Sequence, residues 1–224
     1  MKKILKHPRK LGKNSTMLLA AAAFALSTSS AFAQVQCLQN TTWRGSTGNW
    51  FTTTNWNNGV PNSSINAQVN NGGTAQITSS LVTANACTLT IGPGAVSVDA
   101  LLNVVGSVTV GSSGTGLLAL GNSATVSAGS LTVGKSGTLQ FDVIPATTGT
   151  VNVTGTATLN ATSTVKVTMT GTFTPGTQYT LVTATGGVSG TFGTNSITYP
   201  HGQGFIPQIT YDATHVYLYL VQIP

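Results

Sequence analysis

A short strand-and-turn pattern recurs through the middle of the chain. Each copy joins two apolar residues through one Thr or Asn, and a glycine follows within two residues. The copies begin at Leu89, Val108, Leu131 and Val151, so their starts are nearly evenly spaced. One strand and one glycine turn in each period of about 20 residues is typical of a solenoid, in which every coil stacks on the one before it.

Strict alternation of side chains strengthens this prediction between residues 151 and 173. Odd positions there are apolar or small, and even positions are Asn, Thr or Lys. Such alternation places apolar side chains on one face of a strand and polar ones on the other. A single strand of this length would be unusual, so we expect corners at Gly155 and Ser163 to divide it into several strands of one wall. The pattern predicts an all-β fold, a right-handed parallel β-helix with a narrow aliphatic interior.

The two ends of the chain differ from the repeats, as terminal coils must if they are to cover an open core and unpaired strand edges. Near the start lie the three tryptophans, Trp43, Trp50 and Trp56, which either cap the first coils or stack on sugars. Near the end, two strand-like segments flank Asp212, which predicts a closing β-hairpin with Asp212 in its turn.

Residues 1–33 have the features of a secretory signal peptide. A basic start precedes a short apolar run, and the segment ends in Ala31-Phe32-Ala33, which predicts cleavage after Ala33. The sequence therefore divides into a signal peptide (1–33), Trp-rich N-terminal coils (34–80), β-helix repeats (81–171) and a C-terminal cap (172–224). We expect an exported protein, located at the cell surface, outside the cell or in the periplasm.

Charge does not indicate a nucleic-acid partner. Six of the nine basic residues lie in the predicted signal peptide, and the remaining three balance the three aspartates. The positive charge of the whole chain therefore reflects the predicted export signal rather than binding to nucleic acid.

Two cysteines, Cys37 and Cys87, follow the signal peptide. Export permits a disulfide between them, although two small buried apolar side chains are an equal alternative.

One segment matches the phosphate-binding loop of nucleotide hydrolases. Residues 129–136 satisfy G-x-x-x-x-G-K-[ST]. That loop works only where a helix follows it, because the helix N-terminus holds the phosphate. Residues 138–143 instead have the pattern of another strand, so the match is a strand and turn of the repeat. We expect no bound nucleotide.

Paired carboxylates are the remaining candidates for catalysis. Asp99 and Asp142 are separated in the sequence by about two coils, which places them about 10 Å apart on one face. This is close to the carboxylate separation of inverting glycosidases, although turn or surface roles explain the same residues. His201 and His215 are isolated and make no metal site. We expect no catalytic, metal or cofactor-binding residues and a non-enzymatic protein; the alternative is a secreted glycan-active enzyme or a carbohydrate-binding module.

The C-terminal segment resembles the end of a Gram-negative autotransporter passenger. The family pattern G-x-x-Y-x-L-[VI]-x-A, then G-x-F, then a hairpin with Y-D in its turn, is matched by Gly176, Tyr179, Leu181, Val182, Ala184, Gly190, Phe192, Ile209, Tyr211, Asp212, Val216, Leu218 and Leu220. The Trp-rich start is also similar to the first coils of such passengers.

This resemblance implies a parallel β-helix stem with an adhesive role, whose partners would be host-surface ligands, matrix ligands or glycans. It implies structural roles in a cap for Tyr179, Phe192, Tyr211 and Asp212. It also implies that residues 172–224 nucleate folding of the stem. In the family an outer-membrane β-barrel follows the passenger, so we expect a separate or missing barrel, or a free-standing exported protein.

Overall fold

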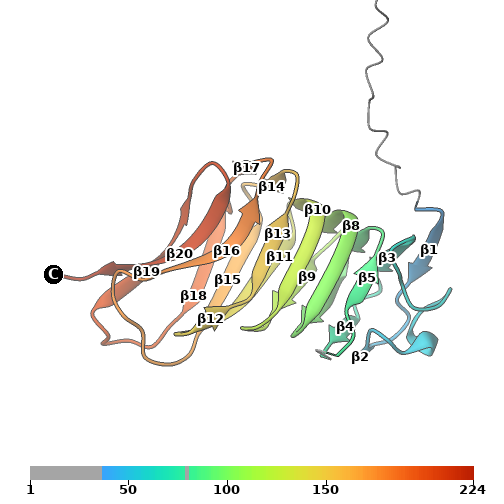
Figure 1. Cartoon of the computed structure of the whole chain (residues 1–224), viewed down its shortest axis with the longest axis horizontal. Helices are drawn as coiled ribbons and strands as arrows, with labels where there is room; N and C mark the ends of the chain where they lie inside the picture. Colours follow the sequence, from blue (N-terminus) through green and yellow to red (C-terminus); the bar gives the residue numbers. More distant parts are fainter. Residues whose placement is uncertain (1–36, 79–80) are drawn as a thin grey trace, which may run out of the picture. The chain divides into compact units, whose positions relative to one another are not determined.

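A computed structural model of the chain describes residues 37–78 and 81–224, which belong to one compact unit. The predicted signal peptide lies outside the described residues. Apart from the short 3-10 helix η1 (Thr53–Asn55), the regular elements described are all β-strands. Figure 1 shows them stacked side by side in chain order.

The strands form three walls, and most neighbours within a wall are parallel. The first wall contains β5 (Ala84–Ala86), the first halves of β8 (Leu101–Val110) and β10 (Thr125–Val133), β13 (Thr150–Val153) and β16 (Gln178–Ala184). The second wall contains β1 (Gln39–Thr42), β3 (Ile65–Val69), β6 (Leu89–Ile91), the second halves of β8 and β10, β14 (Ala157–Leu159) and β17 (Val188–Gly190).

The third wall contains β2 (Thr47–Asn49), β4 (Thr74–Ile77), β7 (Gly94–Val98), β9 (Gly116–Leu120), β11 (Gly137–Ile144), β15 (Thr164–Met169) and β18 (Thr194–Thr198), and the short β12 (Thr147–Thr148) pairs antiparallel with β11. From β5 to β18 the chain visits the three walls in the same order in about five turns. The predicted parallel β-solenoid is therefore confirmed.

The interior is filled by the inward side chains of these strands. On most of these strands, buried side chains alternate with half-buried or exposed ones, as in β9 and β11. Because the parallel register pairs equivalent positions, like side chains stack from turn to turn. On the third wall Val96, Leu118, Leu139 and Val165 form one such column, and each is completely buried. Full burial of a side chain of this size stabilises the fold by about 1.5–3 kcal/mol.

The register confirms three of the four predicted repeat copies and corrects the fourth. Leu89 pairs with Val108, and Val108 pairs with Leu131. Leu131, however, pairs with Ala157, whereas Val151 lies on the first wall opposite Val126. The assignment of Val151 to the series is wrong. Strands of the first and second walls have the same alternation of buried and outward side chains, so the sequence pattern does not distinguish them.

The long alternating segment is divided where the sequence predicts, but its strands do not share one wall. Its corners fall after β13 and after β14, at Gly155 and just before Ser163. The resulting strands β13, β14 and β15 belong to the first, second and third walls in turn. The alternation of apolar and polar side chains continues through each corner because the strands on all three walls direct their apolar side chains into the same interior.

Glycines stack at the corner between the first and second walls. Gly106, Gly129, Gly155 and Gly186 occupy it on successive turns, and the backbone N–H of Gly155 donates to the carbonyl oxygen of Gly129 over 2.8 Å. A Cβ added to Gly155 would lie 2.6 Å from that oxygen. The corner therefore requires glycine because the backbones of neighbouring turns approach too closely for a side chain.

From β5 onward the number of residues in each turn increases, while parallel pairing within each wall is kept. Early in the stack Ala84 pairs with Leu102, whereas later Val151 pairs with Val182, a partner much further along the sequence. The extra residues lie in the connections between strands. The walls therefore set the pairing, and the connections absorb the difference in length.

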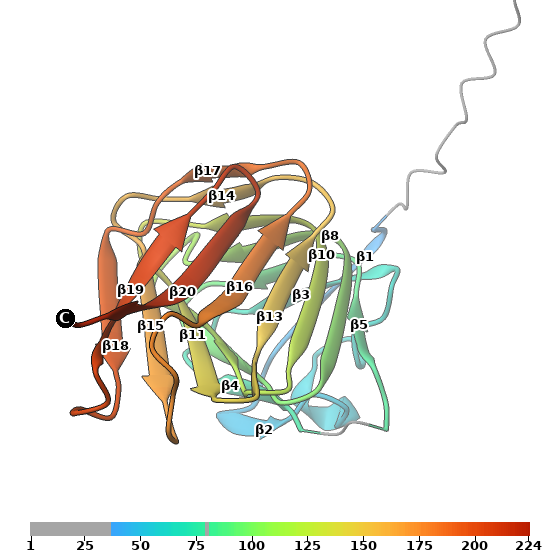
Figure 2. The ribbon, with the colours of Figure 1, turned by 60° about the vertical axis from the view of Figure 1, so that its left-hand side comes forward.

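A β-hairpin ends the fold. β19 (Phe205–Tyr211) and β20 (His215–Gln222) pair antiparallel, and β20 also pairs antiparallel with β16 of the last turn. The predicted closing hairpin, with Asp212 in its turn, is thus confirmed. Figure 2 shows the hairpin against the last turn. Beneath it, the ring of Phe173 makes edge contacts with Tyr179 and Phe205, with ring centroids 6.0 and 6.2 Å apart.

Candidate functional site

Asp99 and Asp142 lie in one column on the outer side of the third wall. Val98 pairs with Leu120, and Leu120 pairs with Phe141. The next residue on each strand is Asp99, Gly121 and Asp142 respectively, so a glycine separates the two acids. The sequence places the acids two turns apart on one face, and the register agrees.

The glycine opens a notch between the two carboxylates. Asp99, Gly121, Asn122, Ser123 and Asp142 line a depression of about 210 Å³. A Cβ at position 121 would clash with Asp99 Oδ1, so the absence of a side chain there lets the Asp99 carboxylate extend over Gly121. Partial burial raises the pKa of Asp142, and the negative charge of Asp99 raises it further.

The chemistry available at the notch is that of two neighbouring carboxyl groups. Hydrolysis of a glycosidic bond with inversion uses a pair of carboxyl groups, and the raised pKa of Asp142 is in the direction expected for the general acid of such a pair. Asn122 and Ser123 add an amide and a hydroxyl at the rim, and the Ser123 hydroxyl donates to Asn122 Oδ1 over 3.0 Å.

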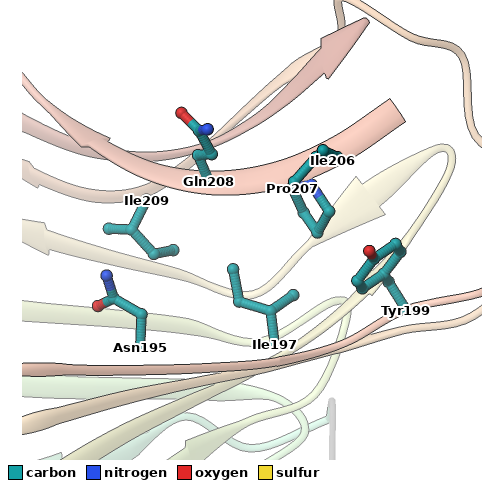
Figure 3. Close-up of a pocket in the computed structure, with 7 residues that line it drawn as sticks. All are labelled: Asn195, Ile197, Tyr199, Ile206, Pro207, Gln208 and Ile209. Carbon is teal, nitrogen blue, oxygen red and sulfur yellow. The ribbon is translucent and has the colours of Figure 1, made fainter. Parts of the chain in front are cut away.

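A second hollow lies at the C-terminal end of the stack, between β18 and β19. It has a volume of about 460 Å³ and is lined by Asn195, Ile197, Tyr199, Ile206, Pro207, Gln208 and Ile209. Figure 3 shows Ile197 and Ile209 pointing into the space between the two strands. Each strand is the last of its sheet, so the groove has an unpaired strand edge on both sides. Sequence reasoning missed it, because only the bend of the hairpin brings the two strands together.

The tryptophans form a buried cluster rather than an exposed platform. Trp43, Trp50 and Trp56 are between 0 and 3% exposed. Trp56 packs edge-on against both others, with ring centroids 5.1 Å from Trp43 and 4.8 Å from Trp50. The Trp56 indole N–H donates to the carbonyl oxygen of Trp50 over 2.7 Å. Their ring faces are not accessible to a sugar.

Cys37 and Cys87 form a disulfide that joins the chain before β1 to the corner after β5, with Cα atoms 5.7 Å apart. Disulfides persist in oxidising compartments, so this bond is typical of an extracytoplasmic protein.

The C-terminal residues of the passenger-like pattern contact one another and the last turn. The Tyr179 hydroxyl donates to the carbonyl oxygen of Pro145 over 3.0 Å. The Phe192 N–H donates to the Tyr211 hydroxyl over 3.2 Å. Asp212 accepts the backbone N–H of Thr214 and the Tyr217 hydroxyl, both over 2.7 Å, and these bonds lower the pKa of Asp212 well below its usual range.

The phosphate-loop match has no helix. Residues 129–136 cover the end of β10 and the turn that leads directly into β11. Within residues 37–78 and 81–224, no group of three or more His, Cys, Asp and Glu side chains is arranged to hold a metal ion. Nor does that part of the chain contain a helix long and apolar enough to cross a membrane.

No protein-family model matches the chain, and a search of curated proteins finds no match. The β-solenoid fold follows from the strand pairing described above.

Proposed function

We propose that this chain is an exported, non-enzymatic β-helix stem with an adhesive role, similar to the autotransporter passengers that it resembles. The observation that carries the proposal is the C-terminal hairpin, in which β20 pairs antiparallel with β16 and so covers the edge of the first wall. The Cys37–Cys87 disulfide supports export. In this role the segment 172–224 is the cap on which the remaining coils fold.

Truncation tests the cap. Removing residues 176–224 exposes the edges of β13, β14 and β15 and the apolar interior beneath them. We expect a stem that proteases cleave much faster than the full chain. A stem that stays as resistant as the full chain would contradict the proposal.

Refolding kinetics separate nucleation from simple stabilisation. Leu218→Ala removes a completely buried side chain that pairs with Tyr179, and such truncations cost about 2–5 kcal/mol. If the cap nucleates folding, the variant refolds more slowly; if the cap forms late, only unfolding accelerates. The neighbouring Tyr219→Ser, on the outward face of β20, is the matched control and should leave both rates nearly unchanged.

The adhesive role needs a separate measurement. Cells that export the chain should adhere to immobilised matrix proteins or glycans more than cells carrying an empty vector. Fractionation of the same cells should place the chain in the periplasm, at the surface or in the medium. Equal adhesion by both cell types would contradict the adhesive role without affecting the cap.

A second candidate function, cleavage of a glycan, is favoured by the notch between Asp99 and Asp142 alone. Polysaccharide cleavage that disappears in both Asp99→Asn and Asp142→Asn, but persists in Asp212→Asn, would support it. No cleavage of any tested polysaccharide by the unmodified protein would contradict it. Carbohydrate binding through the tryptophans is not proposed, because these side chains are buried.

A further inference from the structure

Two parallel columns of hydroxyl side chains run along the outer face of the second wall. The first column contains Thr88, Ser107, Ser130 and Thr156, and the second column contains Thr90, Thr109, Thr132 and Thr158. The two columns follow from a [ST]-x-Thr sequence on each of four successive turns, in which the central residue is buried. Figure 2 shows the later strands of this wall, β14 and β17, lying side by side along the stack.

The backbone holds these side chains in a regular grid. Thr90 pairs with Thr109, Thr109 with Thr132, and Thr132 with Thr158, without a shift of register among them. The buried residues between the columns, Leu89, Val108, Leu131 and Ala157, are completely inaccessible to solvent and fix the orientation of each strand. The Thr88 hydroxyl donates to Asn66 Oδ1 over 2.7 Å and the Thr156 hydroxyl donates to the carbonyl oxygen of Gly186 over 3.3 Å, so these two hydroxyls are used within the protein. The column of Thr90, Thr109, Thr132 and Thr158 lies on the outward side of the sheet, since outward and inward side chains alternate along each strand.

The face carries no charge. In the described part of the chain, Arg44, Lys135 and Asp212 lie outside strands, Asp99 lies just beyond the end of β7, and Asp142 and Lys166 lie on the third wall. A charged ligand would thus find no counter-charge on this grid. The complementary partner is an uncharged surface with hydrogen-bonding groups at a fixed spacing.

The spacing of the grid is close to that of ice. Neighbouring parallel strands lie about 4.8 Å apart, and alternate residues of one strand lie about 6.6 Å apart. Tetrahedral hydrogen bonding between oxygen atoms about 2.75 Å apart gives ice repeats of about 4.5 Å within a layer and about 7.3 Å along the hexagonal axis. The differences are about 0.3 and 0.7 Å per interval, small beside the oxygen–oxygen distance of about 2.75 Å.

We propose that the outer face of the second wall binds ice. The hydroxyl groups replace water at lattice positions, and the methyl groups order the water between them. The site goes beyond the structural role proposed above and does not depend on it, because it requires only the folded stack. A crystal plane held by the grid cannot advance where the protein sits.

The test is the freezing behaviour of the full chain, purified after export. We expect its solution to show a gap between melting and freezing temperatures and to shape the ice crystals into facets. Thr109→Tyr and Thr132→Tyr place bulky rings in the centre of the grid and should abolish both effects. Asn103→Tyr, on the outward face of the first wall of the same turn as Thr109, is the matched control and should retain both.

Each outcome decides the proposal. Absence of the gap and of faceting with the unmodified protein overturns it. Retention of both effects in the two Thr variants also overturns it, since binding would then occur elsewhere. Circular dichroism and thermal unfolding show that each variant is folded; should a Tyr variant fail to fold, Thr132→Ala takes its place and should weaken the gap while leaving the fold intact.

Discussion

At the scale of single residues, the backbone approach at the corners determines which positions must be glycine. Gly106, Gly129, Gly155 and Gly186 stack where the first wall meets the second, and each lies against the backbone of the turn below. A methyl group at such a position must displace a carbonyl group that already accepts a hydrogen bond. The glycines that follow repeated strands in the sequence are therefore of several kinds, and those with a backbone neighbour leave the least room for a side chain.

Gly155→Ala should destabilise the protein by about 1–3 kcal/mol, as overpacking does in a dense interior. The reason is the distance of 2.6 Å between the added Cβ and the carbonyl oxygen of Gly129. Urea denaturation followed by circular dichroism measures the loss. The adjacent exposed Thr154→Ala is the control and should change stability by less than about 0.5 kcal/mol.

Asp142→Asn should stabilise the protein, by less than about 1 kcal/mol, and only at higher pH. Because the pKa of Asp142 is raised in the folded state, stability of the unmodified protein falls as pH rises from the ordinary value of 3.8 through the raised one. The advantage of Asn should therefore vanish below that interval. Thermal unfolding across pH 3 to 7 tests this, and an advantage that is the same at every pH would contradict it.

In the same experiment, Asp212→Asn should have the opposite effect on stability. The pKa of Asp212 is lowered by the Thr214 N–H and the Tyr217 hydroxyl, so its contribution to stability is present above the ordinary pKa and is lost as pH falls. This variant should be less stable than the unmodified protein near neutral pH.

At the scale of strands, alternation predicts which side of each strand faces the core but not which wall the strand belongs to. The series Leu89, Val108 and Leu131 is recovered from sequence because each strand is followed at once by glycine. Val151 is wrongly assigned to this series because its strand has the same alternation of apolar and polar residues and a glycine two residues after the strand ends. Neighbouring walls bury their side chains in one interior, so pattern alone cannot distinguish them.

The candidate sites are likewise only partly predictable from the sequence. The column of Asp99 and Asp142 is predictable, because it needs only the period of the repeat. The groove between β18 and β19 is not, because it depends on the direction in which the hairpin leaves the last turn.

Leu131→Ala in β10 tests the assignment of faces. Leu131 is completely buried in the column that includes Val108 and Ala157, so the variant should lose about 2–5 kcal/mol of stability. Ser130→Ala, on the outward face of the same strand, should lose less than about 0.5 kcal/mol. Equal losses in urea denaturation would mean that β10 does not face the core as described.

At the scale of the whole stack, each turn contacts only its neighbours, so a local constraint has a local effect. The Cys37–Cys87 disulfide encloses a separation of 50 residues at the N-terminal end. In the chain-entropy model, closing a loop of this length stabilises the folded state by about 4 kcal/mol. That contribution acts on the turns within the loop rather than on the stack as a whole.

Replacing both cysteines by Ser should therefore loosen one end. Amide hydrogens of β1 to β5 should exchange faster by a factor of about 100 or more, while those of β13 to β16 keep their protection. Hydrogen exchange read by mass spectrometry resolves the two regions. Uniform acceleration along the chain would show instead that the stack unfolds as one cooperative unit.

The lengthening of successive turns at constant register has a consequence for how such a chain changes over generations. A duplication or loss of one complete turn leaves every other turn with an equivalent neighbour, and an insertion in a connection leaves the walls unaltered. Length can therefore vary among descendants of this gene in steps of one turn, while the buried columns and the corner glycines are inherited with little freedom.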